Sequence, residues 1–113
     1  MIRRGEIWWA SLPAAVGSGP GFRRPVLVVQ ANSFNDSAIR TVICAVITAN
    51  LHLAKAPGNV QLGRRASGLN KESVVNVSQL VTLDKRFLTE HVSDVAPASL
   101  RSVDAGLRLA LAL

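Results

Sequence analysis

The chain has 113 residues, of which 49% are hydrophobic, and a formal net charge of +6. This length and apolar content predict one domain, residues 1–113, and exclude a small scaffold that depends on disulfides. The lone Cys44 is expected to be a small buried hydrophobe, and no apolar run approaches the roughly 18 residues of a membrane span. We therefore expect a cytoplasmic protein that makes no membrane contact.

The excess positive charge is confined to the first 65 residues. This part carries eight basic side chains against two acids, whereas residues 66–113 balance five against five. Such an asymmetry indicates a face for a polyanion, either a nucleic acid or an acidic protein segment that competes with it.

In the first 83 residues, short apolar runs separated by turn-forming residues predict a series of short strands. The expected strands cover 5–12, 25–30, 41–48, 60–62 and 73–83, followed by a turn over 84–89 and a brief strand over 92–95. The run 41–48 is almost wholly apolar and rich in β-branched residues, which predicts a strand buried on both faces. In the run 73–83, alternation predicts that Val75, Val77, Val81 and Leu83 share one face.

Two adjacent tryptophans lie in the first expected strand. Because neighbouring strand positions point to opposite faces, one of Trp8 and Trp9 is expected in the core and the other near the surface or a dimer seam. A nucleic-acid base stacked on one ring is the alternative to plain core packing.

The last segment has helical periodicity. Pro97 is placed as a first helical residue, and Leu100, Val103, Leu107 and Leu111 recur at helical spacing, which predicts a helix over 97–112. Short strands followed by one terminal helix predict a mainly β, α+β fold, a small and strongly curved barrel.

A glycine-rich loop leads directly into two arginines and a proline. Arg23 and Arg24 follow the loop 17–21, and Pro25 restricts Arg24 to extended backbone. This arrangement places a guanidinium fork at the mouth of a strand, where it is suited to hold an oxyanion such as a phosphate. From the loop alone, the alternative is an ordinary basic surface loop.

Residues for conventional acid–base or metal chemistry are scarce. The two histidines, His52 and His91, form no zinc motif, and the seven carboxylates lack the close spacing of a two-metal nuclease. We therefore expect no metal and no cofactor. RNA cleavage suits such a chain, because the ribose 2′-hydroxyl is the nucleophile and the protein needs only to align the substrate and neutralise the transition state.

Seven blocks of sequence, in family order along nearly the whole chain, resemble the MazF/PemK family. They are Arg4–Trp8, Val16–Ser18, Arg24–Gln30, Val46–Asn50, Pro57–Val60, Glu72–Lys85 and Val103–Leu107. The resemblance implies a homodimeric toxin of a type II toxin–antitoxin pair with an SH3-like, CcdB-like barrel. It also implies a metal-independent, sequence-specific endoribonuclease that cleaves single-stranded RNA to a 2′,3′-cyclic phosphate and a 5′-hydroxyl, which inhibits translation and growth. A cognate MazE-like antitoxin with an acidic, disordered tail would compete for the basic groove.

The resemblance implies roles for individual residues. Arg24 matches the family's catalytic arginine, which stabilises the scissile phosphate, and Thr48 matches the threonine that completes the site. Gly17 and Ser18 match the loop that covers RNA, and Gln79 lies where relatives contact a base. The further RNA-binding candidates are Arg23 and Lys55, on charge, together with Asn50 and Asn76.

One departure from the family concerns the chemistry. Many relatives follow the Gly-Ser of this loop with a glutamate, whereas Gly19 and Pro20 stand there in this chain, so an Arg24/Thr48 mechanism is favoured over carboxylate catalysis. Two other classes stay open: a toxin of the same fold that poisons DNA gyrase by binding alone, and a non-catalytic barrel that binds RNA or protein. Cleavage of RNA in excess EDTA discriminates between them.

Overall fold

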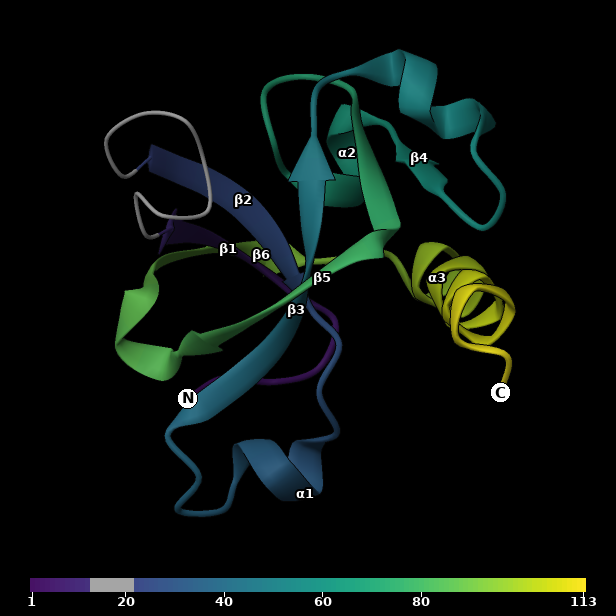
Figure 1. Cartoon of the computed structure of the whole chain (residues 1–113). Helices are drawn as coiled ribbons and strands as arrows, with labels where there is room; N and C mark the ends of the chain where they lie inside the picture. Colours follow the sequence, from purple (N-terminus) through teal and green to yellow (C-terminus); the bar gives the residue numbers. More distant parts are fainter. Residues whose placement is uncertain (13–21) are drawn as a thin grey trace.

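A curled, six-stranded antiparallel sheet forms the body of the molecule, with a C-terminal helix beside it (Figure 1). This computed structural model describes residues 1–12 and 22–113. The strands are β1 (Glu6–Leu12), β2 (Phe22–Val28), β3 (Thr41–Thr48), β4 (Val60–Leu62), β5 (Ser73–Asp84) and β6 (Leu88–Asp94). They are ordered β4-β5-β3-β2-β1-β6 across the sheet, and every pairing is antiparallel. The expected mainly β fold with a terminal helix is confirmed.

In residues 1–12 and 22–113 the helical segments are one long helix and four short ones. The C-terminal helix α3 (Pro97–Leu111) was predicted from its periodicity, and its first residue is the proline expected there. The short segments are α1 (Asn32–Asn35), η2 (Leu51–Lys55), α2 (Arg64–Ser67) and η3 (Lys85–Phe87), none of which is long enough to show a period. In the part of the chain that the structure describes, no helix is long and apolar enough to cross a membrane.

Two strands begin earlier than expected, and β2 also ends at Val28 rather than at residue 30. β2 begins at Phe22 rather than at residue 25, because its first residues pair with β1 although they carry no apolar run. β6 begins at Leu88, so the expected turn over 84–89 is shorter than predicted. Among the described strands β6 pairs with β1 alone and lies at the edge of the sheet, so most of its side chains are exposed and show no apolar alternation.

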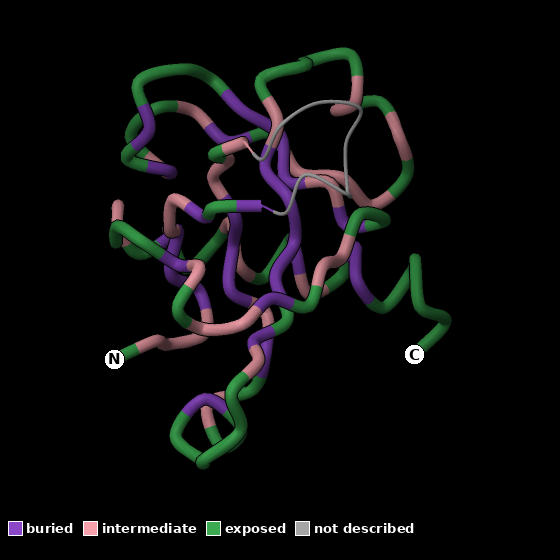
Figure 2. Tube along the Cα trace, turned by 60° about the vertical axis from the view of Figure 1, so that its left-hand side comes forward, coloured by how far each residue is buried: buried purple, intermediate pink, exposed green. Residues whose placement is uncertain are grey.

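Hydrophobic side chains form two clusters, and β3 supplies buried residues to both. Figure 2 shows the buried stretches of the chain in purple. The first cluster includes Ala45 and Ile47 of β3, and the second includes Val42 and Cys44. The prediction that this strand is buried on both faces is thus confirmed for Cys44–Ile47. Burial raises the pKa of the Cys44 thiol to about 12, as expected for a thiol in an apolar site.

The predicted shared face of β5 is wrong because the strand contains a bulge. Ala45 lies opposite Leu80, but the next residue along β3, Val46, lies opposite Asn76, so three residues of β5, 77–79, have no partner on β3. Because side chains alternate between the two faces of a strand, an odd number of extra residues moves every β5 side chain beyond the bulge to the opposite face of the sheet. As a result Val75 and Val77 pack in the first cluster, whereas Val81 and Leu83 pack in the second.

The helix α3 packs closely against the turn before β4, because a glycine lies on each side of the contact. It buries Val103, Gly106 and Leu107, and a Cβ built on Gly106 would lie 2.0 Å from the carbonyl oxygen of Gly58. Gly58 has φ +84°, a left-handed conformation that favours glycine. The side chain of the next residue, Asn59, fixes this turn, since its amide donates to the Leu53 carbonyl at 2.9 Å and its oxygen accepts from the Val77 N–H at 2.9 Å.

The two tryptophans point to opposite faces of β1, as expected, but neither is fully buried. Trp8 packs at the edge of the second cluster and Trp9 at the edge of the first. The expectation that one of them is a core residue is therefore wrong. Both rings have polar neighbours: the imidazole of His91 stacks on Trp8 at 5.2 Å, and the guanidinium of Arg23 lies 4.7 Å from the centre of the Trp9 ring.

Candidate active site

A cleft of about 530 Å³ opens where β2 and β3 separate. Pairing of these strands ends at Val26 and Val46, next to Pro25, which has no N–H to donate to a ladder. Continuing the register of the paired residues sets Arg24 opposite Thr48. Both residues line the cleft, together with Trp9, Pro25 and Ile47 on this side. Separation of the two strands thus brings together the two residues predicted to be catalytic.

Arg24 is half-buried, and its guanidinium lies 5.0 Å from the centre of the Phe22 ring. Among the residues that the structure describes, no carboxylate forms an ion pair with it. The adjacent Arg23 is engaged elsewhere: its guanidinium covers Trp9 and donates to Glu90 at 2.6 Å. Two neighbouring arginines therefore differ in availability, and Arg24 is the one that an anion in the cleft can reach.

Thr48 and Asn50 continue the same wall at the end of β3. The Thr48 hydroxyl accepts a hydrogen bond from the Asn50 N–H at 3.1 Å. The Asn50 side-chain oxygen in turn accepts from the His52 N–H at 3.2 Å and caps η2. These bonds use acceptor oxygens, so the hydroxyl hydrogen of Thr48 and the amide hydrogens of Asn50 stay available to donate.

The opposite wall comes from the segment between α2 and β5. It consists of Leu69, Asn70, Lys71 and Ser73, of which Asn70 and Lys71 are exposed. Sequence reasoning missed these two polar residues. Lys71 belongs to the electrically balanced part of the chain, and only the antiparallel pairing of β3 with β5 brings the start of β5 to the end of β3.

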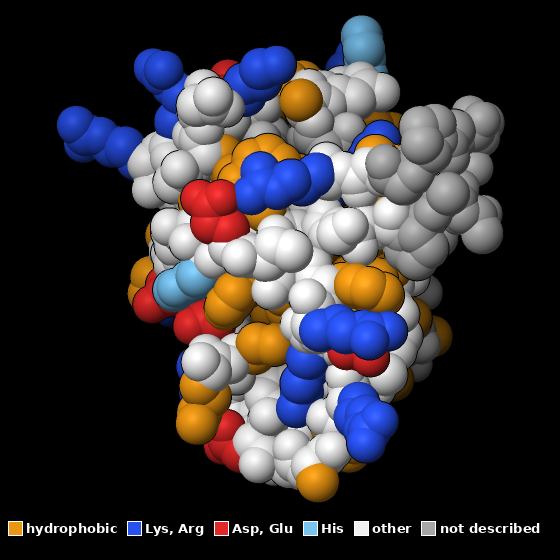
Figure 3. All heavy atoms as spheres, turned by 90° about the vertical axis from the view of Figure 1, so that its left-hand side faces the viewer, with side chains coloured by type: hydrophobic (Ala, Val, Ile, Leu, Met, Phe, Trp, Pro, Cys, Tyr) orange, Lys and Arg blue, Asp and Glu red, His pale blue; other side chains and the backbone are white. Residues whose placement is uncertain are grey.

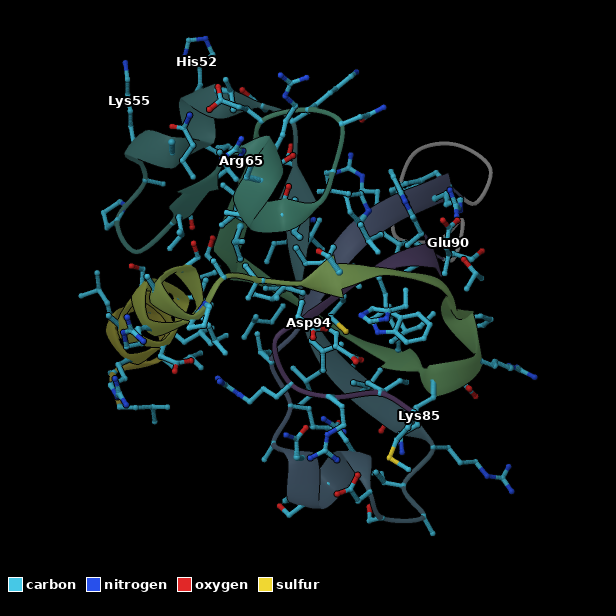
Figure 4. The ribbon with its side chains drawn as sticks, turned by 180° about the vertical axis from the view of Figure 1, so that it is seen from behind. His52, Lys55, Arg65, Lys85, Glu90 and Asp94 are labelled. Atoms are coloured by element: carbon cyan, nitrogen blue, oxygen red, sulfur yellow. The ribbon has the colours of Figure 1, made fainter. Side chains whose placement is uncertain are left out.

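The other predicted RNA-binding residues do not line the cleft. Lys55 and His52 project outward from η2 (Figure 4). Asn76 accepts hydrogen bonds from the backbone and hydroxyl of Ser78 at 3.3 and 2.8 Å, and Gln79 is exposed within the β5 bulge. Of the predicted set, the cleft contains Arg24, Thr48 and Asn50. Gly17 and Ser18 lie outside the described residues.

The charge of the cleft favours an anion. Its described lining holds two cations, Arg24 and Lys71, and no carboxylate. Figure 3 shows Lys and Arg side chains over the upper and the lower part of one face, with Asp and Glu side chains beside some of them. A guanidinium fork, an ammonium group and hydroxyl and amide donors together suit a phosphate, with the arginine providing bidentate geometry. The described lining also holds no imidazole, so the groups present act by charge and hydrogen bonding.

Known proteins resemble this chain over its full length. A family model described as a PemK-like, MazF-like toxin of type II toxin–antitoxin systems matches residues 3–111. Endoribonuclease MazF6 of Mycobacterium tuberculosis is 49% identical, covering 100% of this chain and 99% of that protein. Endoribonuclease EndoA of Bacillus subtilis is 35% identical over 100% of this chain and 97% of the relative.

A solved structure gives the same result for the fold. A mycobacterial endoribonuclease in complex with its cognate antitoxin superposes with a TM-score of 0.82 at 26% identity, covering 100% of this chain and 97% of that one. Fold, length and sequence agree across these comparisons. The chain therefore belongs to the PemK-like, MazF-like family of toxins from type II toxin–antitoxin systems.

Proposed function

We propose that this chain is a toxin endoribonuclease that cleaves single-stranded RNA in the cleft between β2 and β3. The observation that carries the proposal is the facing pair Arg24 and Thr48, in a cleft whose described lining holds cations and no carboxylate. The relatives with 49% and 35% identity are both named endoribonucleases, which supports the same reaction here.

The proposed reaction uses the substrate's own nucleophile. The ribose 2′-oxygen attacks the adjacent phosphorus and loses its proton, the bond from phosphorus to the 5′-oxygen breaks, and that oxygen gains a proton. The products are a 2′,3′-cyclic phosphate and a 5′-hydroxyl. Arg24 neutralises the charge that grows on the phosphoryl oxygens, and the Thr48 hydroxyl donates to one of them. Lys71 and Asn50 hold neighbouring parts of the strand.

The test is cleavage of a long RNA of mixed sequence by purified protein in excess EDTA. We expect discrete cuts with 5′-hydroxyl ends, and no cut where the ribose at the cleavage site is replaced by deoxyribose. Arg24→Ala should lower the rate about 100- to 1000-fold, as removal of one transition-state donor does elsewhere. Arg24→Lys should lower the rate less than Arg24→Ala does, because lysine keeps the positive charge but lacks the guanidinium fork.

A control variant distinguishes the effect of removing the cleft arginine from the effect of removing any one positive charge. Arg101→Ala removes an exposed arginine of α3, outside the cleft, and should leave the rate unchanged. A normal rate for Arg24→Ala would show that the cleft is not the catalytic centre. No cleavage by the unaltered chain would instead favour a toxin that acts by binding alone.

An acidic antitoxin segment is the proposed partner of the same cleft. The mycobacterial neighbour was solved with its cognate antitoxin, and Arg24 and Lys71 would attract a carboxylate-rich chain as they attract RNA. Addition of the cognate antitoxin should stop cleavage, and its affinity should fall with added salt. Antitoxin binding that leaves cleavage intact would place the partner elsewhere.

The proposed homodimer uses an apolar hollow of about 640 Å³ beside α3. Leu107, Leu111 and Leu113 of the C-terminal segment line it with Phe34 and Ile43, and Phe34 and Leu113 are 56% and 84% exposed. Arg108 and Asp104 also line it, and although Asp104 is paired with Arg4 at 2.7 Å, a twofold contact can bring the Arg108 of one copy to the Asp104 of the other. We expect a dimeric mass by light scattering, and a monomer for Leu111→Glu but not for Leu109→Glu, which lies outside the hollow. A monomeric parent chain would contradict this assignment.

A further inference from the structure

Three metal-ligating side chains from the two ends of the chain meet at one edge of the sheet. Glu6 of β1 lies opposite Asp94 of β6, and His91 lies opposite Trp8. The imidazole Nε2 of His91 is 3.2 Å from Asp94 Oδ1 and 3.7 Å from Glu6 Oε2. All three ligand atoms lie within 4.8 Å of one another.

Glu6 and His91 are held in position before any ion binds. Glu6 is only 9% exposed, and its Oε1 accepts hydrogen bonds from the Arg3 N–H at 2.8 Å and from the Trp8 indole N–H at 3.0 Å. This leaves Oε2 as the oxygen turned toward His91. The imidazole is stacked on Trp8 at 5.2 Å with an interplanar angle of 27°. Such fixed orientation of ligands is typical of protein metal sites.

The charges around the cluster also call for a cation. Four of the described carboxylates each pair with an arginine: Asp36, Asp84, Glu90 and Asp104. Glu6 and Asp94, like Glu72, form no ion pair with a lysine or arginine among the described residues, and the basic group nearest to both is the imidazole of His91. Arg3 and Arg4 line the adjoining hollow but are paired with Asp36 and Asp104.

We propose that Glu6, His91 and Asp94 bind a divalent transition-metal ion, with Zn²⁺ as the favoured ion. Tetrahedral zinc with bonds of about 2.0–2.2 Å sets its ligand atoms about 3.3–3.6 Å apart. The two distances from Nε2, 3.2 and 3.7 Å, bracket that value. One nitrogen and two carboxylate oxygens leave a fourth position for water, and the exposed Asp94 side chain needs only a small movement to close the set.

The ion would act as a clamp on the edge of the sheet rather than in catalysis. None of the three ligands lines the cleft, and along β1 Glu6 is four residues from Ala10, the partner of Arg24, or about 13 Å. Figure 4 shows Glu90 and Asp94 toward opposite ends of β6. The site therefore ties β6 to β1 whether or not the chain cleaves RNA.

The test is titration of untagged, EDTA-treated and dialysed protein with ZnCl₂ at pH 7.5 by calorimetry. We expect saturable binding of one ion per chain, and a melting temperature about 10 °C higher at zinc 100-fold above its Kd. Since Trp8 stacks on His91, Cu²⁺ should also quench tryptophan fluorescence in a saturable way.

Two variants and one control make the result decisive. His91→Asn should abolish the heat of binding, the thermal shift and the quenching. Asp94→Asn, at an exposed position that does not threaten the fold, should weaken binding at least tenfold. His52→Asn removes the other histidine and should change nothing. Absence of saturable binding, or equal binding by Asp94→Asn and the parent, would overturn the proposal and leave the cluster as an ordinary hydrogen-bonded histidine.

Discussion

Replacing Gly106 by alanine tests whether α3 depends on backbone contact with the turn at Gly58. On helix propensity alone, this change in a helix interior stabilises by about 1 kcal/mol. The structure predicts the opposite, because the new Cβ would lie 2.0 Å from the Gly58 carbonyl oxygen and 2.9 Å from its carbonyl carbon. Neither atom can move as a side chain would, since the side chain of Asn59 holds this turn to Leu53 and Val77.

The expected magnitude follows from these opposing terms. Overpacking a well-packed site costs about 1–3 kcal/mol, and a contact with fixed backbone belongs at the upper end. After the gain in propensity, Gly106→Ala should lower the free energy of unfolding by about 2 kcal/mol, or the melting temperature by about 10 °C. The assay is urea unfolding followed by circular dichroism, with all variants at one protein concentration because dimerisation contributes to stability.

Two matched substitutions complete the experiment. Gly63→Ala adds a Cβ with no atom within 4 Å and should have little effect. Ala105→Gly, at the exposed neighbouring position of α3, should destabilise by about 1 kcal/mol through propensity alone. If Gly106→Ala unfolds at the same or a higher urea concentration than the parent, the helix does not depend on this contact and the reasoning is refuted.

Two further predictions concern the helix end and the buried thiol. Ala112 ends α3 in a left-handed conformation with φ 58°, so Ala112→Gly should stabilise the chain by about 1 kcal/mol, seen as a higher urea midpoint; an unchanged midpoint would contradict this. Because burial raises the pKa of Cys44 to about 12, its thiol should not react with a disulfide reagent at pH 8 until the protein is unfolded, and rapid reaction of the native protein would show that Cys44 is accessible.

Elements with strong periodicity could be predicted from the sequence, whereas elements fixed by pairing could not. β3 and α3 were found at their observed positions, within one residue, because β-branched runs and helical spacing are local signals. The short helices and the start of β6 carry no such signal. The face of each β5 side chain was mispredicted for a related reason: the bulge at residues 77–79 exists only through the register with β3.

The candidate site shows the same division. Arg24 could be identified because Pro25 and the preceding glycines are its immediate neighbours in sequence. Its position opposite Thr48 follows from strand register, and the presence of Lys71 in the same cleft follows from sheet order. The cluster of Glu6, His91 and Asp94 could not be predicted from the sequence at all, because pairing of the first strand with the last brings these residues together.

The bulge in β5 has a consequence for how the molecule comes apart. The same strand supplies side chains to both hydrophobic clusters, one on each side of the irregularity, and it pairs with β3 along both parts. Unfolding of either cluster would expose side chains of β5, and the other cluster also depends on β5. The two halves are thus expected to open as one cooperative unit, with amide protons near Ile47 and near Val42 exchanging through a common global event.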